Sequence, residues 1–309
     1  MNIRQLLKDY RVWCLSLALL AMLALFAFPT RQQAGEVYNL TFIVDITRSM
    51  NAKDYRLDDR PVSRLAFVKQ ALRELVGKLP CQSKVGLGVF TERRSTLLFE
   101  PVEVCSGYAE LASSIDHLDW RMAWAADSRI AGGLLNAMQL LQERDSALVF
   151  VSDGQEAPPL NPRYRTDFAG IKGKLKGLII GAGGLQAVAI PKFDQNGKRI
   201  GVYGPDDVPH RSSFGESDLN PEKIEGYDAR NAPFGKHAAT GSEHLSALQE
   251  VYLQQLAAES GLVYRRLDDA DSLLRAVGAP AFAQQQLIVE DIRWRAALAA
   301  LILLLLIYR

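Results

Sequence analysis

Apolar residues in the middle of the chain recur in two alternating patterns. Short β-branched runs such as 38–44 (YNLTFIV) and 147–152 (ALVFVS) are typical of buried strands. Between them, apolar side chains recur every three or four residues, which predicts amphipathic helices. This alternation predicts an α/β fold with a doubly wound, mostly parallel sheet. The predicted strands are 38–44, 85–90, 97–104 at a sheet edge, 147–152, at least one of 178–181 and 187–190, and 262–265; the predicted helices are 62–79, 108–118, 130–142, 245–258 and 270–277.

A longer apolar run lies near the start of the chain. Residues 12–28 contain no charge and follow Arg4, Lys8 and Arg11. About 17–20 apolar residues span a bilayer, and the basic flank places residues 1–11 in the cytoplasm. The alternative is a cleaved signal peptide, but its apolar core is usually shorter and ends in a small-residue cleavage site. We therefore expect an uncleaved transmembrane helix over 12–28.

A second apolar run, 296–307, lies near the end of the chain between Trp294 and Tyr308. It is short for a membrane span, but aromatic and basic flanks can extend such a run. We predict a second transmembrane helix over 294–308, with a buried or surface helix as the alternative. One domain over 37–278 would then face the bacterial periplasm, anchored to the inner membrane, and 31–36 would be a polar linker.

Composition narrows the classes of function. Lys and Arg total 36 and Asp and Glu total 35, so the formal net charge is +1. A nucleic-acid binder that relies on net positive charge is excluded. Hydrophobic residues make up 48% of the chain, which excludes an acidic disordered protein.

The cysteines fit an exported domain. Cys14 lies in the first apolar run, whereas Cys81 and Cys105 lie in the polar middle of the chain. Two cysteines in an exported domain suggest a disulfide. The alternative is two unrelated buried thiols.

One polar segment, 192–242, interrupts the alternating pattern. It is rich in Gly, Pro, Asp and Asn and has almost no apolar period. It is too long for an ordinary connection, which indicates a functional or poorly ordered excursion. If 187–190 is a strand parallel to 147–152, the excursion begins at the carboxyl edge of the sheet.

Candidate chemistry lies at two strand ends. Asp45 directly follows a buried strand, with hydroxyls two and four positions later at Thr47 and Ser49, and Asp153 follows the strand 147–152. Ligands bind outside the carboxyl ends of parallel strands. Oxygen-only donors suit a hard divalent cation, Mg²⁺ first, with Mn²⁺ or Ca²⁺ as alternatives. The null alternative is that these side chains only cap turns.

This pattern resembles the von Willebrand factor A (vWA) domain and its metal-ion-dependent adhesion site. The resemblance covers 37–278 and implies metal ligands at Asp45, Thr47, Ser49 and Asp153, with Thr47 in place of the usual first Ser. The family's middle Thr has no direct match; Ser128 is the candidate and Asp127 its rival. The resemblance also implies a protein partner that offers a carboxylate to the metal.

The sequence supports an enzyme less well than a binding protein. A phosphatase that uses Asp45 as nucleophile would need a second Asp at position 47, where Thr47 stands. The glycines at 181–184 lack the third glycine of a dinucleotide loop. We therefore expect a binding protein rather than an enzyme. Trp120 and Trp124 are either buried packing residues or aromatic contacts at the metal rim.

The segment 45–55, the pair Cys81 and Cys105, and Arg-Met-Ala-Trp at 121–124 resemble the MxaL and MxaC accessory proteins of methanol dehydrogenase clusters, MxaL more closely. That resemblance implies a role in calcium insertion or assembly, with methanol dehydrogenase or other accessory proteins as partners. The alternative is a Bat-type vWA protein of aerotolerance or stress.

Overall fold

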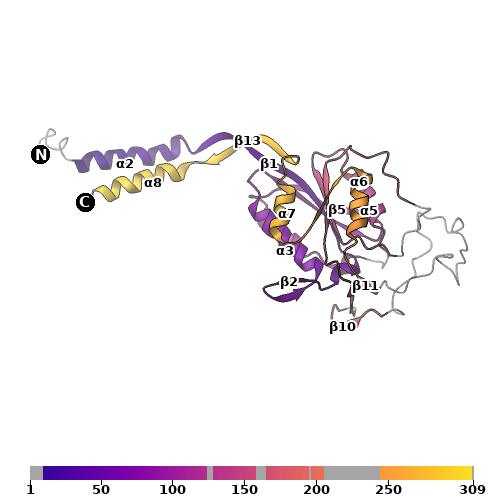
Figure 1. Ribbon diagram of the computed structural model, residues 1–309. Helices are drawn as coiled ribbons and strands as arrows, with labels where there is room; N and C mark the ends of the chain where they lie inside the picture. Colours follow the sequence, from indigo (N-terminus) through magenta and orange to yellow (C-terminus); the bar gives the residue numbers. More distant parts are fainter. Residues whose placement is uncertain (1–9, 124–127, 158–164, 195, 205–243, 308–309) are drawn as a thin grey trace, which may run out of the picture. The chain divides into compact units, whose positions relative to one another are not determined.

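The computed structural model describes residues 10–123, 128–157, 165–194, 196–204 and 244–307 (Figure 1). The chain divides into two compact units. One is Val37–Gln284, and the other combines Met1–Glu36 with Gln285–Arg309. Each unit is described by itself below.

The unit Val37–Gln284 is built on a mostly parallel sheet, which confirms the predicted fold class. Its strands run in the order β12-β7-β6-β1-β4-β5. Neighbours from β12 to β4 pair in parallel, whereas β5 pairs antiparallel with β4 at the edge, as predicted. The strands are β1 (Thr30–Asp45), β4 (Lys84–Thr91), β5 (Arg94–Glu103), β6 (Ala147–Ser152), β7 (Gly177–Gly181) and β12 (Val263–Arg266).

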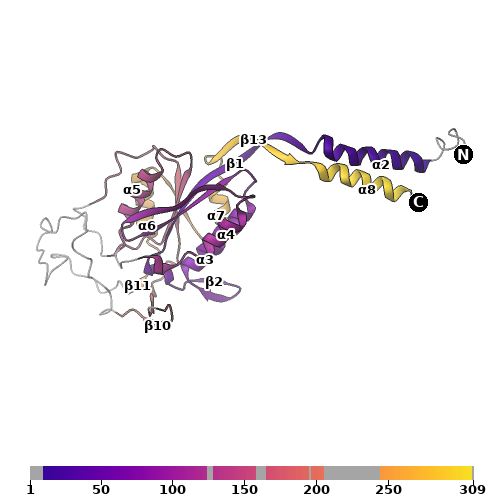
Figure 2. The ribbon, with the colours of Figure 1, turned by 180° about the vertical axis from the view of Figure 1, so that it is seen from behind.

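Helices cover both faces of this sheet (Figures 1 and 2). Alternation along β1 explains why, because Phe42 and Val44 enter one apolar core while Ile43 enters the other. The first core is covered by α3 (Arg64–Lys78), α4 (Tyr108–Asp116) and α7 (Ala270–Val277), and the second by α5 (Ile130–Leu141) and α6 (Glu250–Ser260).

The prediction of at least one strand in 178–181 and 187–190 is confirmed, because β7 (Gly177–Gly181) covers the first piece and β8 (Val188–Ala189) lies in the second. The strand β8 does not run parallel to β6 in the main sheet; it pairs antiparallel with β11 (Leu245–Ser246), where a helix was expected to begin. The excursion then starts as a separate antiparallel hairpin of β9 (Pro191–Phe193) and β10 (Arg199–Val202). These pieces have only two to four residues each, too few to show a period. Residues 205–243 of the excursion lie outside the described part.

The predicted disulfide is confirmed. Cys81 and Cys105 are bonded, with their Cα atoms 5.3 Å apart. Cys81 follows α3 and Cys105 follows β5, so the bridge joins two loops at the amino end of β4. In the chain-entropy model, a loop of this length stabilises the folded state by about 3 kcal/mol.

The second unit contains the two terminal helices. The helices α2 (Tyr10–Ala27) and α8 (Arg293–Leu306) pack side by side (Figures 1 and 2). Among the described helices, α2 is long and apolar enough to cross a membrane. Whether α8 spans stays a prediction.

The expected linker at 31–36 is instead part of a strand. Residues 30–36 form the first half of β1, which pairs with β13 (Ala283–Asp291). Ile292 N–H also donates to the Pro29 carbonyl at 3.2 Å. Residues 30–36 of β1 are largely polar, and the residues that the pairing brings together are about 250 positions apart, so no local pattern predicts the pairing.

Candidate metal centre

The first candidate ligands lie where β1 ends. Asp45 is fully buried and sits beside Phe90 of β4. The Thr47 backbone N–H and Thr47 Oγ1 both donate to Asp45 Oδ1, at 2.8 and 2.7 Å. Ser49 Oγ lies 3.3 Å from Thr47 Oγ1. The turn after β1 therefore brings Asp45, Thr47 and Ser49 together, as their spacing predicts.

A hydroxyl from β6 completes the contacts of Asp45. Ser152 Oγ donates to Asp45 Oδ2 at 2.7 Å, because β6 pairs directly with β1. Ser152 is the last residue of its strand. No role for Ser152 was predicted from the sequence, although its position just before Asp153 at a strand end was the available signal.

Ser128 lies across the end of β1. Its backbone bridges to Glu92, which continues β4, and to Ala157, which follows β6. Because β1 lies between β4 and β6, Ser128 takes the place in the sheet just beyond β1. Its side chain is 3% exposed, and within the described residues Ser128 Oγ has no hydrogen-bond partner. Asp127, the rival candidate, lies outside the described residues.

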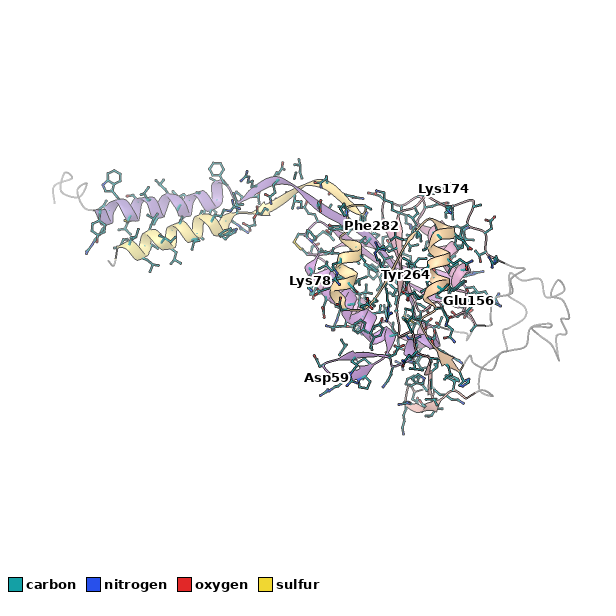
Figure 3. All side chains as sticks on the ribbon, in the orientation of Figure 1. Asp59, Lys78, Glu156, Lys174, Tyr264 and Phe282 are labelled. Atoms are coloured by element: carbon teal, nitrogen blue, oxygen red, sulfur yellow. A yellow bond between two sulfur atoms is a disulfide. The ribbon has the colours of Figure 1, made fainter. Side chains whose placement is uncertain are left out.

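A buried carboxylate fixes the start of α5 beside Ser128. Glu156 Oε1 accepts hydrogen bonds from the Ala131 N–H at 3.1 Å and the Tyr252 hydroxyl at 2.7 Å. Burial raises the pKa of Glu156, against the lowering effect of these donors. Figure 3 shows Glu156 beside α6, the helix that carries Tyr252. Glu156 thus ties the start of α5 to α6.

Asp153, at the end of β6, has a partner that the sequence analysis missed. Arg64, the first residue of α3, donates from Nη1 to Asp153 Oδ2 at 2.6 Å, and neither side chain is exposed. Arg64 also donates to Asp54 Oδ2, at 2.9 Å from Nε and 2.6 Å from Nη2, and to Ser246 Oγ at 2.6 Å. One guanidinium therefore ties α3 to the loop after β1, to β6 and to β11.

A signal for Arg64 was present in the sequence. It precedes Val68, Leu72 and Leu75 by four, eight and eleven positions, so it continues the apolar stripe of the helix. A charged residue on such a stripe is buried only with a partner. The stripe indicates burial but does not identify the partner.

The buried charges of this centre do not balance. Asp45, Asp54 and Asp153 are three carboxylates against the one guanidinium of Arg64, which leaves two negative charges when all are ionised. Burial, followed by repulsion from Asp153, raises the pKa of Asp45 to about 7 despite hydrogen bonds from Ser152 and Thr47. A divalent cation would neutralise the excess.

The residues present fit such a cation. Asp45, Thr47, Ser49 and Ser128 supply oxygen atoms alone, as hard cations prefer. The unpartnered Ser128 Oγ lies at the end of the strand that carries Asp45. Asp153 differs, because Arg64 engages its Oδ2 and the Gln155 N–H donates to its Oδ1 at 3.0 Å. Asp153 is therefore suited to an outer position around the cation.

Comparison with known families gives one match. Residues 40–155 match the model of the von Willebrand factor type A domain. The match spans β1 to the loop after β6 and thus includes each of the five candidate ligand positions. It does not extend to the MxaL and MxaC accessory proteins, and that resemblance stays a prediction.

Solved structures of similar fold come from several bacteria. An aerotolerance-related membrane protein from Bacteroides fragilis is 17% identical, with 77% of this chain and 96% of that chain covered and a TM-score of 0.49. The protein BatB from Bacteroides thetaiotaomicron is 17% identical, with 77% and 94% covered and a TM-score of 0.48. No curated protein is significantly similar in sequence. At these scores the structural likenesses add nothing to the family match.

Proposed function

We propose that this chain is a membrane-anchored vWA protein that binds a divalent cation and, through it, a carboxylate of a partner protein. Mg²⁺ fits the oxygen donors best, and Mn²⁺ or Ca²⁺ are alternatives. When bound, the cation supplies a positive charge with an open position for a ligand. The protein binds and recognises, and we assign no residue to catalysis.

The observation that carries this proposal is the uncompensated end of β1. Asp45 is fully buried and forms no salt bridge within the described residues, while Ser128 Oγ is buried without a partner. A buried carboxylate without a counter-charge is costly, and so is an unsatisfied hydroxyl. A cation coordinated by both would remove both costs.

The anchor and the compartment extend this proposal. With α2 as an uncleaved span and a basic N-terminal flank, the vWA domain would face the periplasm from the inner membrane. The segment 45–55 and the Cys81–Cys105 pair, which resemble MxaL, support a role in maturation of methanol dehydrogenase, through calcium insertion or assembly. Methanol dehydrogenase or another accessory protein would then be the partner.

Cation binding is tested by calorimetry on the full chain in detergent micelles. We expect Mg²⁺ or Mn²⁺ to bind with one site per chain and Asp45→Ala to abolish the signal. Asp145→Ala is the matched control, because this exposed aspartate precedes β6 at the opposite edge of the sheet. Unchanged binding in Asp45→Ala would refute the assignment.

Partner binding needs a second experiment. Affinity capture from membranes, with and without chelator, should recover a partner only when the cation is present, and Asp45→Ala should lose it. Recovery of methanol dehydrogenase subunits would support the maturation role. Equal capture with chelator would refute recognition through the cation.

A further inference from the structure

The strongest unassigned feature is a group of aromatic and basic side chains beside the candidate metal centre. Three segments far apart in sequence build it: η1 (Arg48–Asn51), η2 (Trp120–Met122), and the β9–β10 hairpin with Tyr203. We call this group the basic–aromatic rim. The segment η1 follows Thr47 directly and contains Ser49, so the rim is continuous with the metal loop.

Ring contacts join the three segments. The Trp120 and Phe193 rings stack with centroids 5.4 Å apart, which joins η2 to β9. The Arg48 guanidinium lies 5.6 Å from the centroid of the Tyr203 ring, which joins η1 to the end of the hairpin. The Lys192 ammonium lies 5.7 Å from the same centroid. Such contacts are each worth about 0.5–1 kcal/mol at exposed sites, so they hold the rim in one arrangement.

The rim presents positive charge and apolar surface together. Across residues 48–51, 119–122 and the described part of 191–203 there are five basic and two acidic side chains. Asp119 is paired with Arg121 at 2.8 Å, and Asp194 accepts turn N–H groups from Asn196 and Lys198. Exposed apolar residues lie among them: Met122 is 39% exposed, Ile200 58% and Val202 44%. The basic residues are Arg48, Arg121, Lys192, Lys198 and Arg199.

We propose that the basic–aromatic rim binds an acidic peptide segment of the partner protein, one carboxylate of which reaches the cation. The inference rests on the proposed function, because the cation supplies the anchor. Charge complementarity selects the occupant: a segment that delivers a carboxylate to the metal passes beside Arg48 and Lys192, and further acidic side chains would lie against them. The exposed apolar residues of β10 would contact neighbouring apolar side chains of that segment.

The test uses the full chain in detergent micelles with saturating Mg²⁺ and a fluorescein-labelled peptide of alternating Glu and Leu. Its matched probe replaces each Glu by Gln. We expect the acidic peptide to bind in a Mg²⁺-dependent way, at least tenfold more tightly than the Gln peptide, and more weakly as salt rises. Arg48→Gln should weaken binding about tenfold and Lys192→Gln about fivefold, near the 1.4 kcal/mol that corresponds to a factor of ten.

Controls separate this inference from the proposed function. Lys174→Gln should bind the peptide as the wild type does, because Lys174 precedes β7 at the end of the domain opposite Asp59 (Figure 3) and opposite β10, which Figure 1 labels in the same orientation. Calorimetry should show Mg²⁺ affinity within twofold of wild type in Lys192→Gln, so a change in peptide binding would report the rim. If the wild-type chain bound no Mg²⁺ at all, the proposed function itself would be refuted.

Three outcomes would overturn the rim assignment while the cation site stands. The first is equal binding of the acidic and Gln peptides. The second is wild-type peptide affinity in both Arg48→Gln and Lys192→Gln. The third concerns vesicles with 30% phosphatidylglycerol as a separate probe: if the wild type binds these vesicles, both variants bind them more weakly, and the acidic peptide does not bind, the rim recognises an anionic membrane and the proposal is wrong.

Discussion

The two buried carboxylates at the strand ends, Asp45 and Asp153, are compensated differently. Asp153 carries its own counter-charge, because Arg64 Nη1 lies 2.6 Å from Asp153 Oδ2. Among the described residues, Asp45 receives only neutral donors, from Thr47 and Ser152. Both side chains are fully buried, so exposure does not explain the difference.

This difference indicates that Asp45 and Asp153 have different roles within one site. The Asp153 side is satisfied within the chain and holds α3, β6 and β11 together through Arg64. The Asp45 side retains the uncompensated charge, and the backbone of Ser128, whose hydroxyl has no partner among the described residues, bridges the segments that follow β4 and β6 on either side of β1. Changes on the Asp153 side should therefore act mainly on folding, and changes on the Asp45 side mainly on cation affinity.

The largest expected effect comes from removing the internal counter-charge. Arg64→Met leaves Asp153 and Asp54 without their shared partner, and breaking a buried pair in this way costs about 3–5 kcal/mol. Arg73→Met is the matched control on the same helix, because its pair with Asp116 is exposed and worth about 0–1 kcal/mol. Denaturant unfolding followed by tryptophan fluorescence measures both. Equal stabilities in the two variants would mean that Arg64 does not hold the site.

The second prediction concerns Asp45, the carboxylate without a counter-charge among the described residues. Asp45→Asn keeps the size of the side chain and removes the uncompensated charge, so cation-free stability should stay equal or rise. Cation affinity should fall at least about 100-fold, a loss of about 2.8 kcal/mol at about 1.4 kcal/mol per factor of ten. Calorimetry and unfolding on the same preparation measure the two effects.

Asp153→Asn gives the opposite pattern and completes that comparison. It should destabilise the chain, because Arg64 loses its fully buried partner, while cation affinity falls less than in Asp45→Asn. If the two variants lost cation affinity equally, the asymmetry between the strand ends would carry no functional meaning.

Much of this arrangement was predictable from the sequence. The runs that end at Asp45 and Asp153 are β-branched and fully buried, so their strand character and parallel pairing follow from local pattern. Arg64 was not predictable as a partner, because its three contacts, Asp54, Asp153 and Ser246, lie up to 182 positions away. The β1–β13 pairing was not predictable for a similar reason: residues 30–36 are largely polar, and the strand that pairs with them is remote in sequence.

A smaller effect is expected from the orphan hydroxyl. Ser128→Ala should lower cation affinity about tenfold and leave cation-free stability unchanged or slightly higher, because the lost hydroxyl makes no hydrogen bond there. Ser246→Ala is the control, since Ser246 Oγ accepts from Arg64 and its loss should cost about 1 kcal/mol of stability. A stability loss in Ser128→Ala equal to that of Ser246→Ala would show that Ser128 Oγ has a structural partner.

The smallest expected effect concerns Glu103 and tests whether neutral donors alone can keep a carboxylate ionised. Asp45 also accepts neutral donors, but it is fully buried. Glu103 lies beside the disulfide and accepts N–H groups from Gln82, Cys105 and Ser106. Slight burial opposes the change, but these donors and the Ser106 hydroxyl lower the pKa of Glu103 to about 2, from 4.5. Because the folded pKa lies below the unfolded one, Glu103 stabilises the fold above about pH 4.5 and that stability is lost as pH falls towards 2.

Glu103→Gln should therefore unfold at a lower denaturant concentration than the wild type at pH 7, with the difference shrinking between about pH 5 and pH 2. Solvent screening at this site keeps the difference below about 1 kcal/mol. Asp45→Asn should show the opposite trend. Burial raises the pKa of Asp45 to about 7, so the stability of the wild type should rise relative to this variant as pH falls below about 7. Opposite pH trends in the two variants would demonstrate that desolvation, rather than a shortage of hydrogen bonds, distinguishes Asp45, since both carboxylates accept three or more. A stability difference between Glu103→Gln and wild type that stays constant from pH 7 to 2 would show that the charge of Glu103 does not contribute to stability.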